Sequence, residues 1–140
     1  MALDYPVSIT PTSTGGYVGT FRDVPEALSE GATIDETLEF SLQALVLAVD
    51  FYREDFRPFP SPSKPQKGEL IVSIPASISA KILLLNSMTE GNVRPADLAR
   101  KMEVKSQDVT RLLNIRHSTK IDTIEKALLA LGKRLTLSAS

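Results

Sequence analysis

The spacing of apolar residues divides the chain into a strand-like part and a helical part. Apolar and polar residues alternate in "YPVSITP" (5–11) and again in "GYVGTFRDVP" (16–25), the two-residue period of half-buried strands. The "TSTGG" between them supplies glycines for a hairpin turn. "ALSEGAT" (27–33) predicts a third, short strand. Together these segments predict a small antiparallel sheet.

The apolar spacing then changes to the period of a helix. Thr33 and Glu36 fit a capping box, in which the threonine hydroxyl accepts from the N–H three residues on and the glutamate reaches back. The residues that follow at helical spacing predict one buried face: Ile34, Leu38, Leu42, Leu45, Val46, Val49 and Tyr52. One long helix packed on the sheet is therefore expected.

A proline-rich segment follows this helix. Phe56–Gly68 holds four of the chain's nine prolines, which remove hydrogen-bond donors and favour extended backbone. After it, "ELIVSIP" (69–75) reads as an apolar strand with no partner in the C-terminal half of the chain. We therefore expect it to pair with the first sheet. The predicted first domain is then 1–75, with residues 56–68 as a loop within it, and the second is 76–140.

The second domain has a helical pattern throughout. "ASISAKILLLNSMTEG" (76–91) predicts a helix that ends in a left-handed cap at Gly91. Pro95 suits the first position of a second helix, because its missing N–H costs little there. Ser106 and Asp122 are the expected N-caps of a third and a fourth helix. The fold class predicted for the whole chain is α+β.

The third helix has the side chains of a DNA reader. With Val109, Leu112 and Leu113 facing inward, a polar set lies on its outer side: Ser106, Gln107, Thr110, Arg111 and Asn114. Gln pairs bidentately with adenine and Arg with guanine, and the second helix of a helix-turn-helix enters the major groove. Lys105, Arg116 and Lys120 are candidate phosphate contacts. The alternative is an ordinary solvated polar face, and His117 is expected to be exposed without a catalytic role.

Charge adds a second contrast between the halves. The net charge is -1, but residues 1–80 carry five basic and eleven acidic side chains, and residues 81–140 carry eleven basic and six acidic. Opposite charge predicts a different partner for each half, with nucleic acid favoured by the basic one, although a two-domain protein can acquire such a division by chance.

Composition excludes several kinds of chemistry. The absence of cysteine and the single histidine exclude disulfides, thiol catalysis and the usual zinc sites, so no cofactor or metal is expected. The start has no signal-peptide pattern, and the apolar runs "ALVLAV" and "ILLL" are much shorter than the roughly 20 residues of a membrane span. We therefore expect a soluble, cytoplasmic protein.

Two segments resemble known families. "ADLARKMEVKSQDVTRLLN" with "IDTIEKALLALGKRL" resembles the helix-turn-helix of Cro and phage-repressor type regulators, and "GYVGTFRDVPEALSEGATIDETLEFSLQAL" resembles the HicB antitoxin domain. Their order is that of a HicB-type antitoxin of a type II toxin-antitoxin system. Two positions depart from the patterns: Glu26 stands where a glycine often follows the proline, and Ile115 where many such helices end in glycine. Ile115 is expected to pack inward while "IRHSTK" makes the turn.

The resemblance implies a division of labour. The first domain would have a partial ribonuclease-H-like fold and bind HicA, a small basic toxin that cleaves mRNA, while the second would bind operator DNA and repress the operon. An acidic surface suits a basic partner, and Asp23, Glu26 and Glu30 are candidate toxin contacts, although each taken singly fits ordinary surface solubility equally well. A homodimer reading two half-sites is expected, with the tail "KRLTLSAS" pairing as a strand between its two copies.

Two other functions compete with this one. Ribonuclease-H chemistry needs carboxylates converging on two metal ions, and the predicted strands offer only Asp4 and Asp23 near their ends, so the protein is not expected to be an enzyme. The stronger alternative is a stand-alone repressor whose first domain senses a ligand or dimerises. A neighbouring gene for a small basic toxin would distinguish the antitoxin from it.

Overall fold

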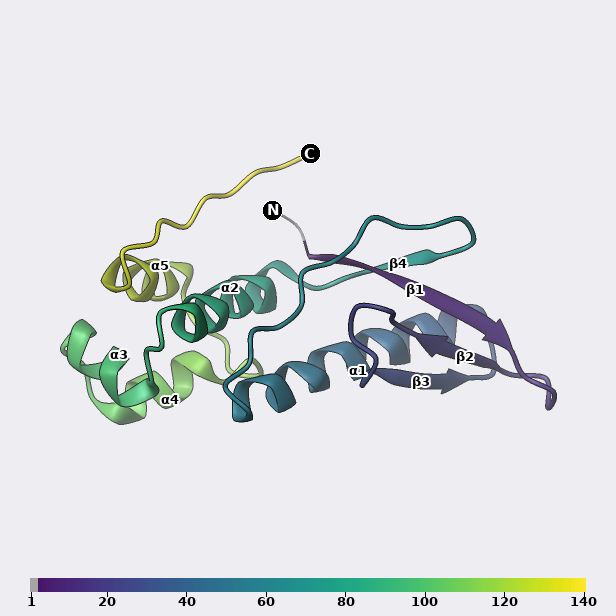
Figure 1. The fold of residues 1–140 in the computed structure, drawn as a ribbon, viewed down its shortest axis with the longest axis horizontal. Helices are drawn as coiled ribbons and strands as arrows, with labels where there is room; N and C mark the ends of the chain where they lie inside the picture. The colour runs from purple at the N-terminus through teal and green to yellow at the C-terminus, as the bar shows by residue number, and fades with distance from the viewer. Residues whose placement is uncertain (1–2) are drawn as a thin grey trace. The chain divides into compact units, whose positions relative to one another are not determined.

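The computed structural model describes residues 3–140. Contacts within the chain divide it into two compact units. The sheet unit contains the residues up to Asp55 together with Phe59–Ile74, and the helical unit contains Phe56–Pro58 and Pro75–Ser140. Figure 1 shows the strands and one long helix in the first unit and the four shorter helices in the second. The α+β class is confirmed.

A four-stranded antiparallel sheet forms the first unit. Its strands are β1 (Asp4–Pro11), β2 (Tyr17–Thr20), β3 (Leu28–Gly31) and β4 (Leu70–Ser73). Their order is β3-β2-β1-β4, and Tyr5 of β1 lies opposite Val72 of β4. The predicted return of the strand after the proline-rich segment is therefore confirmed.

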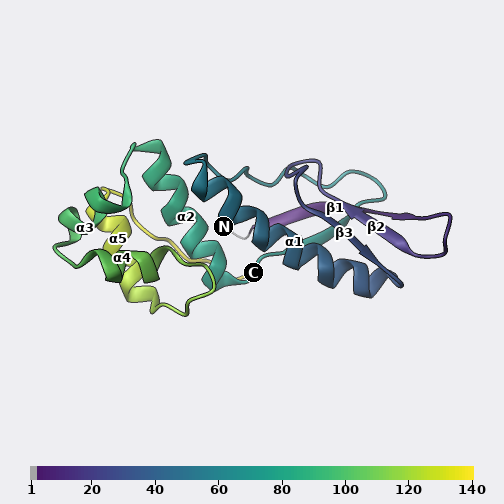
Figure 2. The same ribbon diagram turned by 90° about the horizontal axis from the view of Figure 1, so that it is seen from below.

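Helix α1 (Ile34–Glu54) packs along one face of this sheet (Figure 2). The predicted cap is present, since Thr33 Oγ1 accepts from Glu36 N at 3.1 Å. The Glu36 carboxylate reaches back to Ala32 N at 3.1 Å, one residue before the position that a standard capping box uses. A side chain at Gly19 of β2 would clash with Ser41 of α1, because its Cβ would lie 2.4 Å from the serine oxygen.

The inward face of α1 differs from the one that apolar spacing predicted. The residues buried along it are Thr37, Ser41, Leu45, Ala48, Val49 and Tyr52. Ile34 is 44% exposed, so its predicted burial is wrong; Leu38, Leu42 and Val46 are half-buried. The small residues of β2 and β3 admit only small side chains, and the hydroxyls of Thr37 and Ser41 satisfy themselves on backbone carbonyls one turn back, at 2.7 Å in each case. Hydroxyl residues therefore face the sheet where leucines were expected.

Four helices pack around a second core in the helical unit. They are α2 (Ala76–Glu90), α3 (Pro95–Met102), α4 (Ser106–Leu113) and α5 (Ile121–Ala130). The core is apolar and draws on all four helices. Residues 133–140 form no strand within this chain; their predicted pairing is between two copies and stays a prediction.

Three helix ends differ in detail from the predictions. Gly91 has an ordinary φ of −87°, and the left-handed residue is Asn92 with φ 52°, a residue type that tolerates this region. Ser106 and Asp122 lie inside their helices, whose N-cap residues are Lys105 and Lys120 without side-chain caps. The first turns of these helices contain an acidic residue instead, which favours the positive end of the helix dipole.

Candidate functional site

Helices α3 and α4 are joined by a tight turn. Glu103 ends α3 in the left-handed region, with φ 57° and ψ 45°. Its N–H donates to Arg100 O at 3.2 Å, and the N–H of Val104 donates to Ala99 O at 3.0 Å. Helix α4 then begins at Ser106. This turn directs one polar face of α4 away from the core.

The structure separates the two faces of α4 as the sequence predicted. Val109, Leu112 and Leu113 are at most 3% exposed and belong to the core. All the predicted base-reading residues are exposed: Ser106, Gln107, Thr110, Arg111 and Asn114. Their exposure is confirmed, and their role in reading DNA stays a prediction.

Some of these outer residues already have partners within the chain. Thr110 Oγ1 donates to Ser106 O at 3.1 Å, and Asn114 Oδ1 accepts from Arg116 N at 3.0 Å, which closes the turn after α4. Arg111 lies 3.7 Å from Asp108, but its side chain is 58% exposed. Such an exposed pair is weak, so the Arg111 side chain can turn outward. The Asn114 side chain instead stabilises the turn after α4.

The exit of α4 is held by a buried lysine. Lys81 of α2 is 2% exposed, and its Nζ donates to the carbonyls of Asn114 at 2.7 Å and His117 at 2.5 Å, with Arg111 O at 3.4 Å. Burial lowers the pKa of this ammonium. The carbonyls of Arg111 and Asn114 also accept backbone N–H groups, from Asn114 at 3.3 Å and from His117 at 3.0 Å. The ammonium therefore adds a second donor to each of these carbonyls and supplies a donor to the carbonyl of His117.

Lys81 explains how the chain turns without glycine at position 115. Asn114 has φ −78° and ψ 110°, so no left-handed residue ends α4. Ile115 is 4% exposed, which confirms that it packs inward. Sequence reasoning missed Lys81, and its signal was a single cation inside the apolar run "AKILLL".

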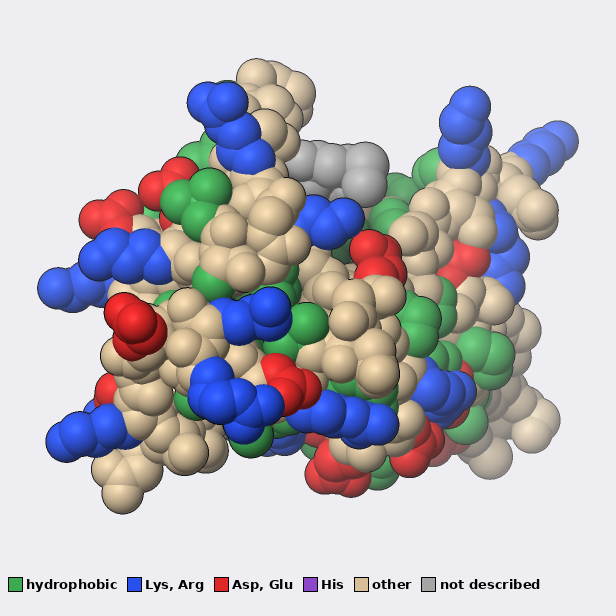
Figure 3. Space-filling model, turned by 60° about the vertical axis from the view of Figure 1, so that its left-hand side comes forward, with side chains coloured by type: hydrophobic (Ala, Val, Ile, Leu, Met, Phe, Trp, Pro, Cys, Tyr) green, Lys and Arg blue, Asp and Glu red, His purple; other side chains and the backbone are tan. Residues whose placement is uncertain are grey.

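The candidate phosphate contacts surround α4. Lys105 precedes the helix, and Arg116 and Lys120 follow it; all three are exposed, as is His117. Figure 3 turns the helical unit toward the viewer and shows Lys and Arg side chains recurring across it, with acidic ones between them. Basic groups beside a polar helix face are the arrangement expected at a phosphate backbone.

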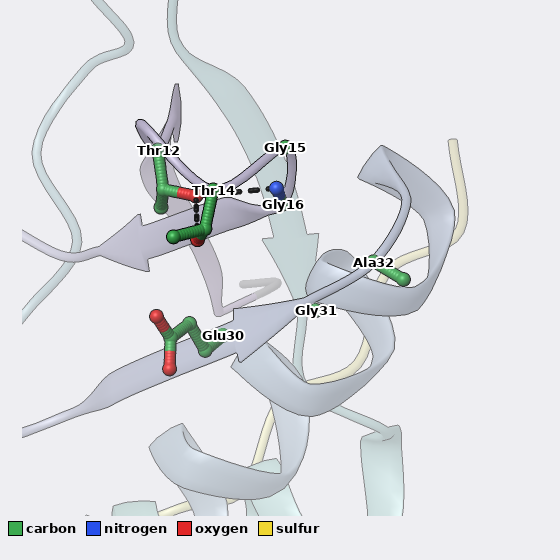
Figure 4. A pocket seen from close by; sticks show the side chains of 7 residues that line it. All are labelled: Thr12, Thr14, Gly15, Gly16, Glu30, Gly31 and Ala32. Atoms are coloured by element: carbon green, nitrogen blue, oxygen red, sulfur yellow. Dashed lines mark hydrogen bonds between the residues drawn. The ribbon is translucent and has the colours of Figure 1, made fainter.

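Two of the three candidate acidic contacts stabilise the sheet unit itself. Asp23, 10% exposed in its side chain, accepts from the backbone N–H of Ser63 at 2.8 Å and also from its hydroxyl. Glu26 accepts from the hydroxyl of Tyr52 at 2.9 Å. Glu30 is exposed, as Glu26 is, and it lies beside an open hollow (Figure 4).

The hollow beside Glu30 is lined mainly by small residues, with Glu30 as its one charged side chain. It lies between the β1–β2 turn and the end of β3, and its lining is Thr12, Thr14, Gly15, Gly16, Glu30, Gly31 and Ala32. Within residues 3–140 no three His, Cys, Asp or Glu side chains come together to hold a metal. Nor does this part of the chain contain a helix long and apolar enough to cross a membrane.

Comparison with known proteins adds the decisive observation. Residues 4–83 match the family described as "HicB_like antitoxin of bacterial toxin-antitoxin system". The chain belongs to the HicB-like antitoxin family. Antitoxin HicB 2 of Photorhabdus laumondii subsp. laumondii is 50% identical over 137 residues, which cover 98% of this chain and 96% of that protein.

Other HicB relatives also extend along nearly the whole chain. Antitoxin HicB of Escherichia coli (strain K12) is 42% identical over 135 residues, covering 96% of this chain and 98% of the relative. Antitoxin HicB 1 of Photorhabdus laumondii subsp. laumondii is 45% identical over 136 residues, which cover 97% of this chain and 86% of that protein. These relatives support an antitoxin role within a toxin-antitoxin system.

Proposed function

We propose that this HicB-like protein neutralises a small basic toxin of the HicA type and represses its own operon by binding operator DNA through α4. The antitoxin role rests on the family. The DNA-binding role rests on one structural observation: the polar outer face of α4 is exposed between basic residues, while its apolar face is buried. The partial ribonuclease-H-like and helix-turn-helix assignments belong to this proposal.

Within this proposal α4 reads bases and its neighbours bind phosphates. Gln107 and Arg111 have the side chains for adenine and guanine, in the first and the last turn of the helix respectively. Lys105, Arg116 and Lys120 neutralise the backbone and fix the register. One such unit makes few contacts, so the active form is a dimer that reads two half-sites about one DNA turn apart.

A pair of variants tests the reading of DNA. Arg111→Ala should cost about 1–3 kcal/mol on the operator and relax the preference at one base position, whereas Lys120→Ala should weaken operator and random DNA alike. Fluorescence anisotropy on both DNAs at two salt concentrations measures this. Equal losses on both DNAs for both variants would contradict a base-reading role for Arg111.

The neighbouring gene tests the toxin role. Its product, if small and basic, should arrest growth when expressed alone and be harmless when co-expressed with this protein. The upstream DNA should bind this protein in a mobility-shift assay, and repeating the assay with the neighbouring product tells whether the toxin strengthens or releases operator binding. The absence of rescue on co-expression would argue against the antitoxin function.

A further inference from the structure

Helix α1 carries a row of exposed apolar side chains that its packing on the sheet leaves unused. Phe40, Leu47 and Phe51 are 39%, 48% and 58% exposed. They lie seven and then four residues apart, so with 3.6 residues per turn they form one line along the helix. We call these three residues the α1 stripe.

The stripe is separate from the face of α1 that packs on the sheet. That face is formed by residues such as Leu45, Val49 and Tyr52, which are at most 6% exposed. Single exposed apolar residues need no explanation, but aligned phenylalanines and leucine in a soluble helix are typical of an interaction surface. A second apolar line on a helix already packed along one side indicates a partner.

One flank of the stripe is acidic. By helical geometry Glu36, Glu39, Asp50 and Glu54 all lie on the same side of it. The glutamates are exposed, and Asp50 is half-buried, 3.4 Å from Arg53, the only basic residue of α1. The surface is therefore apolar along its centre and negative along one edge.

This charge disfavours a second copy of the chain as the occupant. In a two-fold antiparallel pair of α1 helices, equivalent flanks face each other and the carboxylates would repel. In a parallel pair each acidic flank would face the sheet-ward flank, whose Thr37, Ser41 and Ala48 are buried against the sheet, so no cation would meet the carboxylates. A partner with an apolar strip bordered by Lys or Arg satisfies both features.

We propose that the α1 stripe and its acidic flank are the surface on which the protein binds its basic toxin partner. This assignment rests on the proposed antitoxin function and gives it a location. Phe40, Leu47 and Phe51 supply the apolar contact, and the flanking carboxylates speed encounter and fix orientation. Asp23 and Glu26 have hydrogen-bond partners within the sheet unit, and this surface does not depend on them.

Leu47→Arg tests the surface directly, with Leu28→Arg as the matched control. Leu28, 64% exposed, lies on β3 in the same unit, away from α1's outer side. The Kd for the purified product of the neighbouring gene, measured by calorimetry, should rise about 30-fold or more for Leu47→Arg and stay within about 3-fold for Leu28→Arg. Unchanged circular dichroism and operator binding show that both variants fold.

A triple variant tests the flank separately. Glu36→Gln, Glu39→Gln and Glu54→Gln together should slow association and flatten its salt dependence, with a smaller effect on dissociation. The proposed surface would be wrong if Leu47→Arg bound the toxin with the wild-type Kd, or if Leu28→Arg raised the Kd as much as Leu47→Arg does. Conversion of a dimer to a monomer by Leu47→Arg with toxin binding intact would overturn it too, in favour of a second copy. If the wild-type protein itself does not bind, the proposed function fails instead.

Discussion

The two units each contain an irregular segment, and the two segments are held in different ways. The loop Phe59–Gly68 of the sheet unit and the turn Ile115–Lys120 of the helical unit have no regular secondary structure apart from turns. In both, side chains from other elements donate to backbone carbonyls. Two side chains donate to carbonyls of the loop, which also buries its own Phe59. In the turn after α4 one ammonium, that of Lys81, makes the side-chain contacts from another helix.

The loop is held at several points along its length. Phe59 is 4% exposed and packs edge-on against Tyr5 and Tyr52, with ring centroids 5.8 and 5.3 Å apart. The hydroxyl of Tyr5 donates to Pro60 O at 2.6 Å, and Arg22 donates to Lys64 O at 2.5 Å. A proline-rich segment supplies few backbone donors of its own, so contacts of this kind determine its path.

The turn after α4 is held by bonds of its own and by one side chain from another helix. Asn114 Oδ1 accepts from Arg116 N, and the carbonyl of Asn114 accepts from His117 N. Lys81 Nζ donates to the carbonyls of Asn114 and His117. An unpaired buried polar group is expensive. Losing one contact of the loop should therefore leave its other side-chain contacts in place, whereas losing Lys81 removes the hydrogen bonds that tie the turn to α2.

The largest effect should come from the loop's buried ring. Phe59→Ala removes the side chain between two tyrosines and should destabilise the sheet unit by about 3–5 kcal/mol, the usual cost of truncating a core phenylalanine. Urea unfolding followed by circular dichroism measures the change. Phe51→Ala is the control, because Phe51 is 58% exposed and should change stability by less than about 0.5 kcal/mol. Similar losses for the two variants would mean that Phe59 does not hold the loop.

The second effect concerns the turn. Lys81→Met keeps most of the aliphatic stem and removes the donor, so it should cost about 1–3 kcal/mol. The carbonyl of His117 loses this donor, and the carbonyls of Arg111 and Asn114 keep one backbone N–H each. Amide exchange should accelerate at residues 114–120 more than in the α2 and α5 cores. Exposed Lys126 on α5 provides the control Lys126→Met, which removes the same charge. If amide exchange at residues 114–120 of Lys81→Met were as slow as in the wild type, the other contacts of the turn would be enough to hold it.

Much of the fold follows from local patterns in the sequence. Alternation predicted β1 and β2, and helical spacing predicted the five helices. An apolar run without a partner in the C-terminal half predicted that β4 pairs within the first sheet, as it does with β1. The errors arise where packing overrides pattern. Thr37 and Ser41 lie against the sheet in place of leucines because small strand residues bring α1 close. The spacing of apolar residues within α1 cannot predict this, because it depends on residues of the strands.

The candidate site shows the same limit. The exposed face of α4 was predictable, because its apolar residues alternate with polar ones at helical spacing. The role of Lys81 was not, since its acceptors are backbone carbonyls 30 to 36 residues away, and every residue type has one. Asp23 and Glu26 looked like surface charge because their partners, Ser63 and Tyr52, lie far along the chain.

The smallest effect should come from an ion pair at the far end of the loop. Glu69 accepts from Arg22 Nε at 3.0 Å and Nη2 at 3.1 Å, and from Gln66 N at 2.7 Å. These hydrogen bonds, the one from Arg22 first, lower the pKa of Glu69 below its ordinary 4.5. A carboxyl whose pKa is lowered on folding stabilises the protein above its unfolded pKa, and that contribution disappears as the pH falls through the folded value.

The sheet unit should therefore lose stability below about pH 4.5 by more in the wild type than in Glu69→Gln, which cannot titrate. Urea midpoints measured between about pH 2 and pH 7 would show the two curves converging on the acid side. Glu39→Gln, at an exposed position of α1, controls for the loss of one carboxylate. Because Tyr5, Phe59 and Asp23 still hold the loop after Glu69 is protonated, the loop should keep its path. A cooperative loss of the loop in Glu69→Gln at neutral pH would contradict the redundancy that separates this segment from the turn held by Lys81.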